Sequence, residues 1–355
     1  MTKKVFALFL PTLFTVNILN AQVRTNENLL RVSAGKLGIE QVSNYARAMA
    51  LAKEKKWELS ILLSNGNHAR LTGVDEFGFP VYTRSYNNTI AAATTRANQL
   101  WPGGTSGFNL TGSTPTLQNK LGIWEYDGAP LKDHVEFSGR IVQKDVPAAG
   151  RSSDFHATHV AGTMIAKGIN PVAKGMAFDI PNLISYDNNS DLSEMTAEAA
   201  SGMLLSNHSY GLLTGWNYNT TNTRWEFYGR VGENEDYRYG YYSRESSLID
   251  SILYNAPFYI MVQSAGNDRN NNGPEVGQPY YRYDASNTMI SAGNRPAGIS
   301  SNDGYDIIAG KAIAKNNITI GAVRGMAAGY NKPSDVVMSS FSAWGPTDDG
   351  RIKPD

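Results

Sequence analysis

The chain contains no cysteine among its 355 residues. This absence excludes thiol catalysis, disulfide bonds and cysteine-ligated metal sites. Histidine is also scarce, and its five positions are His68, His134, His156, His159 and His208. Imidazole chemistry therefore has few candidate residues.

Neither sign of charge is in excess, because Lys plus Arg and Asp plus Glu each number 32 and the formal net charge is +0 at pH 7. Nothing in this charge balance suggests nucleic acid as a partner, so we expect none. Hydrophobic residues make up 41% of the chain, enough for a globular core. Beyond the N-terminus no run reaches the roughly 20 apolar residues of a membrane span, so we expect none in the mature chain.

The N-terminus has the pattern of a secretory signal. Lys3 and Lys4 precede a mostly apolar stretch over 5–19, and Ala21 offers a small residue before a cut at Gln22. We predict a signal peptide over 1–21 and a secreted, periplasmic or cell-surface protein. A buried N-terminal helix is the alternative. Without disulfides, an exported protein depends on core burial for its stability.

Three further regions follow. Residues 22–95 predict a small α+β module, with a helix over 22–56, a strand over 57–63 and a hairpin from 69–74 and 81–86. Residues 96–118 are rich in Asn, Thr, Gly and Ser and predict a linker. From 119 to 355, short apolar runs alternate with helical segments, which indicates an α/β domain with a mostly parallel sheet.

Within this domain we expect strands over 121–126, 183–186, 202–208, 258–263 and 318–323, and helices over 156–166, 192–200 and 245–255. Asp191 and Glu194 have the spacing of a capping box at the start of the second helix. An aromatic-rich insertion over 214–244 interrupts the pattern. Its aromatic side chains either read a substrate or, as is commoner, pack over their own loop.

One stretch, residues 154–164, carries the strongest chemical signal. Asp154 is predicted to cap a helix, because its carboxylate can accept backbone N–H groups of the first turn. Ala161, Gly162 and Thr163 are small, so another backbone can lie close to that helix. A histidine at the start of this helix would be held on a rigid element and would face a cleft.

The stretch resembles the His-Gly-Thr-His-Val-Ala-Gly-Thr motif of subtilisin-like serine peptidases (the S8 family, or subtilases), with Ala157 in place of glycine. The resemblance implies that His156 is the general base. Two alternatives stay open: a structural histidine, and a metal site formed by His156 and His159. A metallohydrolase would need a third ligand and a base, and neither is visible at a motif spacing.

Asp127 ends the first predicted strand of the domain, seven residues before His134. Subtilases have the same layout of strand, Asp, tight turn and His, so the resemblance implies that Asp127 is the triad acid that orients the base. Glu125 lies two positions earlier on the same face of the strand and is the competing carboxylate. The spacing to His134 favours Asp127. A capping or turn role for Asp127 is the remaining alternative.

Two more strand ends resemble subtilase landmarks. Asn207, Ser209 and Gly211 match the Asn-x-Ser-x-Gly edge that pairs with a peptide substrate as an added strand. His208 within it is a second, weaker candidate for the base.

Ser264, Ala265 and Gly266 resemble the small residues that form the primary specificity pocket. Asn267 resembles the amide donor to the oxyanion, although it is also a plausible turn asparagine before Asp268.

The nucleophile is missing from the expected place. In the family the serine follows the Asp, His and Asn in chain order, yet no Gly-Thr-Ser-Met segment follows Asn267. The single Gly-Thr-Ser, at 104–106, lies in the predicted linker and ahead of Asp127. Residues 353–355 read Lys-Pro-Asp, which resembles the segment just before the nucleophile. We therefore expect a C-terminally truncated peptidase domain whose serine lies beyond residue 355, and a fragment that is inactive as it stands.

The resemblance implies an α/β, subtilisin-like three-layer fold, incomplete and preceded by a small α+β module at the place of an inhibitory, folding-assisting pro-region. It implies an exported serine endopeptidase that acts on proteins or peptides. The alternative function is a catalytically dead binding or surface protein on the same fold. Calcium is a candidate ion through the family alone, because the sequence offers no specific ligand cluster and no other cofactor is expected.

Overall fold

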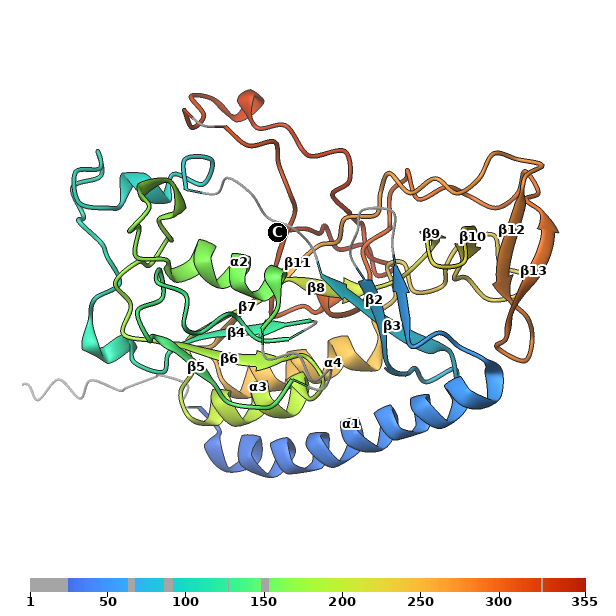
Figure 1. Cartoon of the computed structure of the whole chain (residues 1–355), viewed down its shortest axis with the longest axis horizontal. Helices are drawn as coiled ribbons and strands as arrows, with labels where there is room; N and C mark the ends of the chain where they lie inside the picture. The colour runs from blue at the N-terminus through green and yellow to red at the C-terminus, as the bar shows by residue number, and fades with distance from the viewer. Residues whose placement is uncertain (1–24, 63–67, 86–91, 127, 148–152, 327) are drawn as a thin grey trace, which may run out of the picture.

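Figure 1 shows the computed structural model of the chain, which describes residues 25–62, 68–85, 92–126, 128–147, 153–326 and 328–355. The predicted signal peptide and Asp127 lie outside these described residues. In the part of the chain described, no helix is long and apolar enough to cross a membrane.

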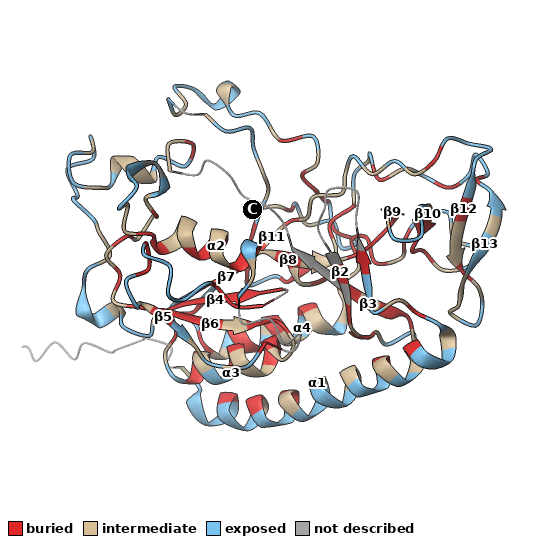
Figure 2. Cartoon of the chain, viewed as in Figure 1, coloured by how far each residue is buried: buried red, intermediate tan, exposed pale blue. Residues whose placement is uncertain are grey.

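A six-stranded parallel sheet forms the centre of the molecule, in the order β14-β11-β7-β4-β6-β5. Its strands are β4 (Leu121–Glu125), β5 (Ile141–Gln143), β6 (Leu183–Asp187), β7 (Leu205–His208), β11 (Ile260–Ser264) and β14 (Ile318–Ile320). The five strands predicted for this domain are all present, and β5 was missed. Every residue of the central strand β4 is buried, as Figure 2 shows for the sheet.

Helices cover both faces of this sheet, which confirms the three-layer α/β fold. The helix α2 (Phe155–Ile165) lies on one face, and α3 (Asp191–Ala200) and α4 (Arg244–Asn255) lie on the other (Figure 1). Successive side chains of β4 point to opposite faces of the sheet, which explains why both faces are covered by helices. Ile123 packs in the cluster that contains the α2 residue Val160, whereas Trp124 packs in the cluster that contains Met195 and Ile249 of α3 and α4.

Trp124 joins three neighbouring strands. Its ring stacks between Tyr186 of β6 and His208 of β7, with centroid distances of 5.0 and 5.2 Å. Its indole Nε1 donates to Oε2 of Glu194 at 3.0 Å. Burial and neighbouring carboxylates raise the pKa of Glu194 to about 9.

The predicted capping box is therefore wrong. Ser190 occupies the N-cap position of α3. Asp191 instead accepts hydrogen bonds from Tyr210 and Lys311, and Glu194 is turned to Trp124.

The N-terminal module has the predicted types and order of elements: α1 (Glu27–Lys55), β1 (Ser60–Leu62), β2 (His68–Val74) and β3 (Pro80–Ser85). The helix α1 lies along α3 (Figure 1). The three strands are antiparallel, and β3 continues into an antiparallel pairing with β8 (Tyr210–Leu212) of the α/β domain. One sheet thus contains strands from both parts of the chain.

The aromatic-rich insertion is larger than predicted. It forms a four-stranded sheet in the order β13-β12-β10-β9, from β9 (Trp216–Asn219), β10 (Arg224–Phe227), β12 (Pro279–Tyr283) and β13 (Met289–Asn294). Its second half lies beyond α4 and β11, so no continuous stretch of sequence marks it. We call residues 213–243 and 267–305 the insertion from here on.

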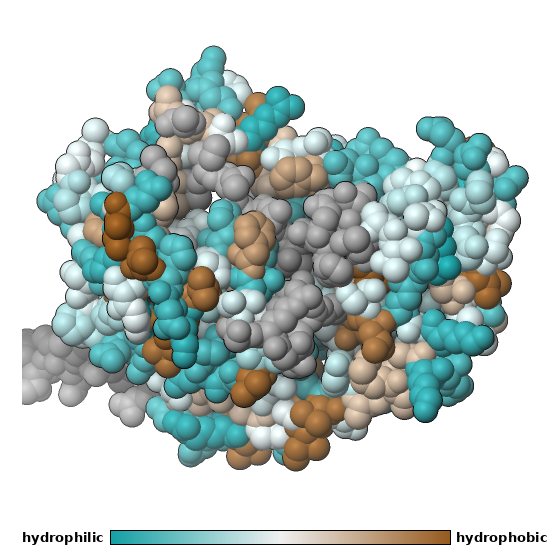
Figure 3. Space-filling view, viewed as in Figure 1, coloured by the Kyte–Doolittle hydropathy of each residue, from teal (hydrophilic) through white to brown (hydrophobic). Residues whose placement is uncertain are grey.

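Five short 3₁₀ helices complete the described elements: η1 (Ala97–Gln99), η2 (Pro115–Leu117), η3 (Pro171–Ala173), η4 (Gly310–Ile313) and η5 (Pro333–Asp335). On the face seen in Figure 3, hydrophobic residues are scattered among polar ones rather than gathered into one patch.

We predict that Glu194→Gln makes the protein more stable at pH 8. Burial raises the pKa of this carboxyl to about 9 in the folded chain, from an ordinary value of 4.5 for glutamate. The native state therefore binds more protons than the unfolded state between these values, and the free energy of unfolding falls as pH rises through that window. Glutamine keeps an acceptor for Trp124 and removes the titration.

Urea unfolding at pH 5 and pH 8 checks this, with the exposed Glu54→Gln as control. The stability gained by Glu194→Gln should be larger at pH 8 than at pH 5. An equal effect at both pH values would contradict the prediction.

Candidate active site

The first turn of α2 is fixed by its cap. Oδ1 of Asp154 accepts hydrogen bonds from the backbone N–H groups of His156 at 2.7 Å and Ala157 at 3.0 Å. The hydroxyl of Thr158 donates to the backbone oxygen of Asp154 at 2.6 Å. The predicted cap is confirmed, and it places His156 on a backbone with little freedom.

His156 contacts a buried carboxylate. Its Nδ1 lies 2.7 Å from Oε2 of Glu125, the last residue of β4. Glu125 has 0% and His156 4% of its surface exposed. Burial raises the pKa of Glu125, while the nearby histidine lowers it. A carboxylate on Nδ1 holds the imidazole in the tautomer in which Nε2 accepts a proton, and it stabilises the imidazolium that follows.

The carboxylate found here is the one that sequence analysis ranked second. Asp127 lies outside the described residues, so its assignment stays a prediction. The useful signal in the sequence was the position of Glu125 within a wholly buried strand, where a charged residue is rare unless it has a partner. The sequence analysis preferred Asp127 over Glu125 because of the spacing from Asp127 to His134.

The other predicted site residues gather through sheet topology. β4, β7 and β11 are adjacent parallel strands, so their carboxyl ends lie along one edge of the sheet. Asn207 is in β7, and its Nδ2 donates to Oγ of Ser209 at 2.8 Å. Asn267 follows β11 by three residues and is partly exposed. Glu125, Asn207 and Asn267 thus come from the ends of three neighbouring strands.

The predicted substrate edge carries a strand of the N-terminal module. Gly211 lies in β8 and pairs with Arg84 of β3, and Tyr210 pairs with Ser85. The pairing is antiparallel. An edge expected to bind a peptide as an added strand is therefore covered by the chain's own backbone.

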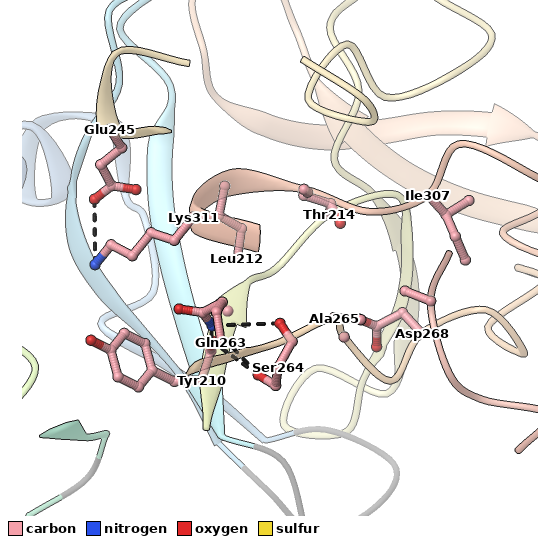
Figure 4. A pocket seen from close by; sticks show the side chains of 14 residues that line it. Tyr210, Leu212, Thr214, Glu245, Gln263, Ser264, Ala265, Asp268, Ile307 and Lys311 are labelled. Atoms are coloured by element: carbon pink, nitrogen blue, oxygen red, sulfur yellow. Dashed lines mark hydrogen bonds and ion pairs between the residues drawn. The ribbon is translucent and has the colours of Figure 1, made fainter. Parts of the chain in front are cut away.

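Ser264, Ala265 and Gly266 line a narrow pocket of about 30 Å³ together with Tyr210 and Gly211 (Figure 4). The two stretches predicted to bind substrate therefore meet at one pocket.

Sequence reasoning missed the polar end of this pocket, where Nζ of Lys311 lies 3.6 Å from Oε1 of Glu245 and also pairs with Asp191. These residues come from η4, α4 and α3, and no motif connects them.

His208 is a structural residue. Its Nε2 lies 2.8 Å from Oγ of Ser206 and its Nδ1 lies 2.9 Å from the hydroxyl of Tyr210. Burial lowers the pKa of His208 to about 3, so the ring is neutral and both nitrogens are engaged. It is not a second base.

The metal alternative gains no support from the described residues, in which no group of three or more His, Asp or Glu side chains is arranged to hold a metal ion. His159 stacks on Phe155 with a centroid distance of 6.4 Å, and burial lowers its pKa. The carboxylate of Glu136 accepts the backbone N–H groups of residues 168–170, which lowers its pKa. Calcium binding stays a prediction.

Comparison with known proteins is consistent with this geometry. The model of the Peptidase S8 or subtilase family matches residues 106–355, which is more than half of the chain. The chain belongs to the subtilase family. Subtilases are serine peptidases, and their substrates are proteins.

Among solved structures, the CspB protease of Clostridium perfringens is similar over 75% of this chain and 80% of that chain, with 14% identity and a TM-score of 0.42. At these values the likeness adds nothing to the family assignment. No curated protein matches.

We predict that Asp154→Ala lowers the free energy of unfolding by about 1 kcal/mol, because α2 loses the side-chain acceptor at its N-cap. Asp154→Asn keeps an acceptor oxygen and should recover most of this loss. Urea unfolding of the two variants measures the difference. Equal stability of Asp154→Ala and the parent chain would show that the cap does not hold α2 in place.

Proposed function

We propose that this protein is an exported serine endopeptidase of the subtilisin type in which Glu125 orients His156. The observation that supports this most directly is the 2.7 Å contact between Nδ1 of His156 and Oε2 of Glu125, both buried, in a chain of the subtilase family. His156 takes the proton of the attacking serine and returns it to the leaving amine. Asn267 donates its side-chain N–H to the developing oxyanion.

Glu125 suits this role for an electrostatic reason. Its Oε2 contacts His156, and its Oε1 has no hydrogen-bond partner among the residues that the structure describes. His156 is thus the charged group that compensates the buried carboxylate when the imidazole is protonated. The attraction between the two is strong because little water screens it. This electrostatic stabilisation is present only when His156 is protonated, so it favours the transition state over the resting enzyme.

The nucleophilic serine, in this proposal, follows residue 355. Residues 353–355 resemble the segment that precedes the nucleophile, and Asp355 is held against the sheet. Its backbone N–H donates to the oxygen of Thr319 at 2.9 Å, and its Oδ2 accepts from the N–H of Thr319 at 2.8 Å. Thr319 is in β14, which neighbours β11. These two hydrogen bonds hold Asp355 against β14, the edge strand of the central sheet.

We further propose that residues 22–95 act as an inhibitory pro-region. The pairing of β3 with β8 supports this, because it covers the edge expected to bind substrate. Maturation would then require a cut between β3 and the α/β domain. The N-terminal pattern supports export through a signal peptide over 1–21.

A matched pair of variants tests the triad acid in the complete protein. Glu125→Gln should lower kcat about 10⁴-fold, because an amide on Nδ1 no longer favours the productive tautomer. Asp127→Asn should change kcat less than about tenfold by the same argument. Hydrolysis of a casein substrate measures both. The reverse ranking would restore Asp127 as the triad acid.

His156→Ala should remove hydrolysis almost completely, by about 10⁴- to 10⁶-fold. Retained activity would refute the role of His156. The dead-enzyme alternative is decided by the coding sequence downstream of codon 355. A Gly-Thr-Ser-Met segment there supports the peptidase, whereas a stop codon supports a binding protein on the same fold.

A further inference from the structure

The turn that carries Asn267 is tied to the chain on both sides of this residue. Gly266 has a φ of +114°, a conformation that favours glycine, and its backbone oxygen accepts from the N–H of Ala343 at 2.9 Å. The backbone N–H of Arg269 donates to the oxygen of Phe341 at 3.2 Å. The turn is therefore held before and after Asn267 by the segment 341–343.

A further contact on this turn comes from the end of the insertion. Nδ2 of Asn302 donates to the backbone oxygen of Asp268 at 3.2 Å, and the backbone N–H of Asn271 donates to the same oxygen at 2.9 Å. Asp268 also lines the narrow pocket (Figure 4). Because Asp268 directly follows Asn267, a contact on its carbonyl acts on the neighbouring residue of the proposed oxyanion donor.

The side chain of Asn302 is buried, with 1% of the residue exposed. Its Oδ1 accepts from the backbone N–H of Trp216 at 3.0 Å and from the hydroxyl of Tyr239 at 2.9 Å. Its Nδ2 donates to the backbone oxygen of Trp216 at 3.2 Å as well as to Asp268. These four bonds use both acceptor positions and both hydrogens of the amide. Since a backbone N–H only donates, the bond from Trp216 fixes which end of the amide faces Asp268.

Gly215 leaves the space that this arrangement needs. Its φ is +59°, and a Cβ at this position would collide with the hydroxyl of Tyr239 and with Oδ1 of Asn302. Asn302 joins residues that lie 34, 63 and 86 positions away in sequence. Trp216 and Tyr239 lie near the two ends of residues 213–243, and Asp268 and Asn302 lie near the two ends of residues 267–305. All four connections between the insertion and the α/β domain therefore meet at one amide.

We propose that Asn302 is a positioning residue for the oxyanion donor: by holding the backbone of Asp268, it fixes the direction in which Asn267 presents its side-chain amide. This inference rests on the proposed function, in which Asn267 donates to the oxyanion. Such a donor stabilises the transition state only if it is aimed before the reaction begins. A displacement of about 1 Å can lower the rate about 100-fold. The base of the insertion is thereby part of the structure that supports catalysis.

A double-mutant cycle in the complete protein tests this inference, with a peptide that spans one cleavage site in casein as substrate. Asn267→Ala should lower kcat about 10²- to 10³-fold. Asn302→Ala should lower kcat about 30-fold and change KM less than about threefold, because the oxyanion forms only after the substrate is bound. In the Asn267→Ala background, Asn302→Ala should lower kcat less than about threefold. Equal losses in both backgrounds would overturn the proposal.

The cycle separates this inference from the proposed function. If Asn267→Ala leaves kcat unchanged, the oxyanion role of Asn267 is wrong, and the inference about Asn302 is wrong with it. If Asn267→Ala lowers kcat as expected and Asn302→Ala does not, only the inference about Asn302 is wrong.

Asn219→Ala is the matched control. Asn219 is also a buried asparagine of the insertion, with 1% exposed, but its amide donates to the carboxylates of Glu58 and Glu226. This variant should lower kcat less than about threefold. A loss as large as that of Asn302→Ala would mean that any loosening of the insertion lowers the rate, and it would overturn the specific role of Asn302.

Hydrogen exchange of the chain 1–355 tests the same contact without hydrolysis. The backbone N–H groups of Ala265, Arg269 and Asn271 are hydrogen-bonded, so we expect the segment 265–271 to be protected. Asn302→Ala should speed exchange in this segment at least about tenfold, whereas Asn219→Ala should leave it within about twofold of the parent chain. Unchanged exchange in Asn302→Ala would overturn the proposal.

Tyr239→Phe replaces Asn302→Ala in both measurements if the latter does not fold. It keeps the aromatic ring and removes the hydroxyl that donates to Oδ1 of Asn302. Exchange in 265–271 should then be about three- to fivefold faster, with a similar loss of kcat that disappears in the Asn267→Ala background. A variant with parental exchange and parental kcat would count against the proposal.

Discussion

A buried carboxylate in contact with a histidine ring is the constraint on which the arrangement of this domain depends. Glu125 is fully buried at the end of the central strand, and His156 beside it supplies a hydrogen-bond partner for its carboxyl group. His156 in turn holds its position because Asp154 caps the first turn of α2. The packing of Val160 and Ala161 beneath that turn keeps the helix on the sheet. The strand β4, the cap at Asp154 and the helix α2 thus together position the contact between Glu125 and His156.

The opposite face of the sheet carries a second polar network, and it joins the substrate edge to the N-terminal module. His208 contacts the hydroxyl of Tyr210, which donates to Asp191. Asp191 also accepts from Gln41 of α1 and pairs with Lys311 at the end of the narrow pocket. Backbone pairing of β3 with β8 reaches the same edge from the other side. Hydrogen bonds and backbone pairing therefore connect the N-terminal module, the substrate edge at β8 and the narrow pocket.

Much of this architecture was predictable from local sequence. Every strand and helix expected in the central sheet and its covering layers is present, because hydrophobic alternation and helical spacing persist over each of them. The cap at Asp154 followed from the residue type alone. The insertion was predicted only in part, since β12 and β13 join its sheet from beyond α4 and β11. Pairing between strands so far apart leaves no periodic signal.

The sequence by itself determined the order of the motifs and through them the family, and it made His156 the candidate base, because these depend on residue types at short spacing. Only the tertiary structure showed that Glu125 lies against His156. The local sequence pattern ranked this carboxylate second, whereas the 2.7 Å distance from its Oε2 to Nδ1 of His156 depends on how β4 and α2 pack together. Tertiary structure also decided that the aromatic residues of the insertion pack against the N-terminal module. Burial of Tyr228 and Tyr283 depends on surfaces more than a hundred residues away in sequence, and their own neighbours do not encode it.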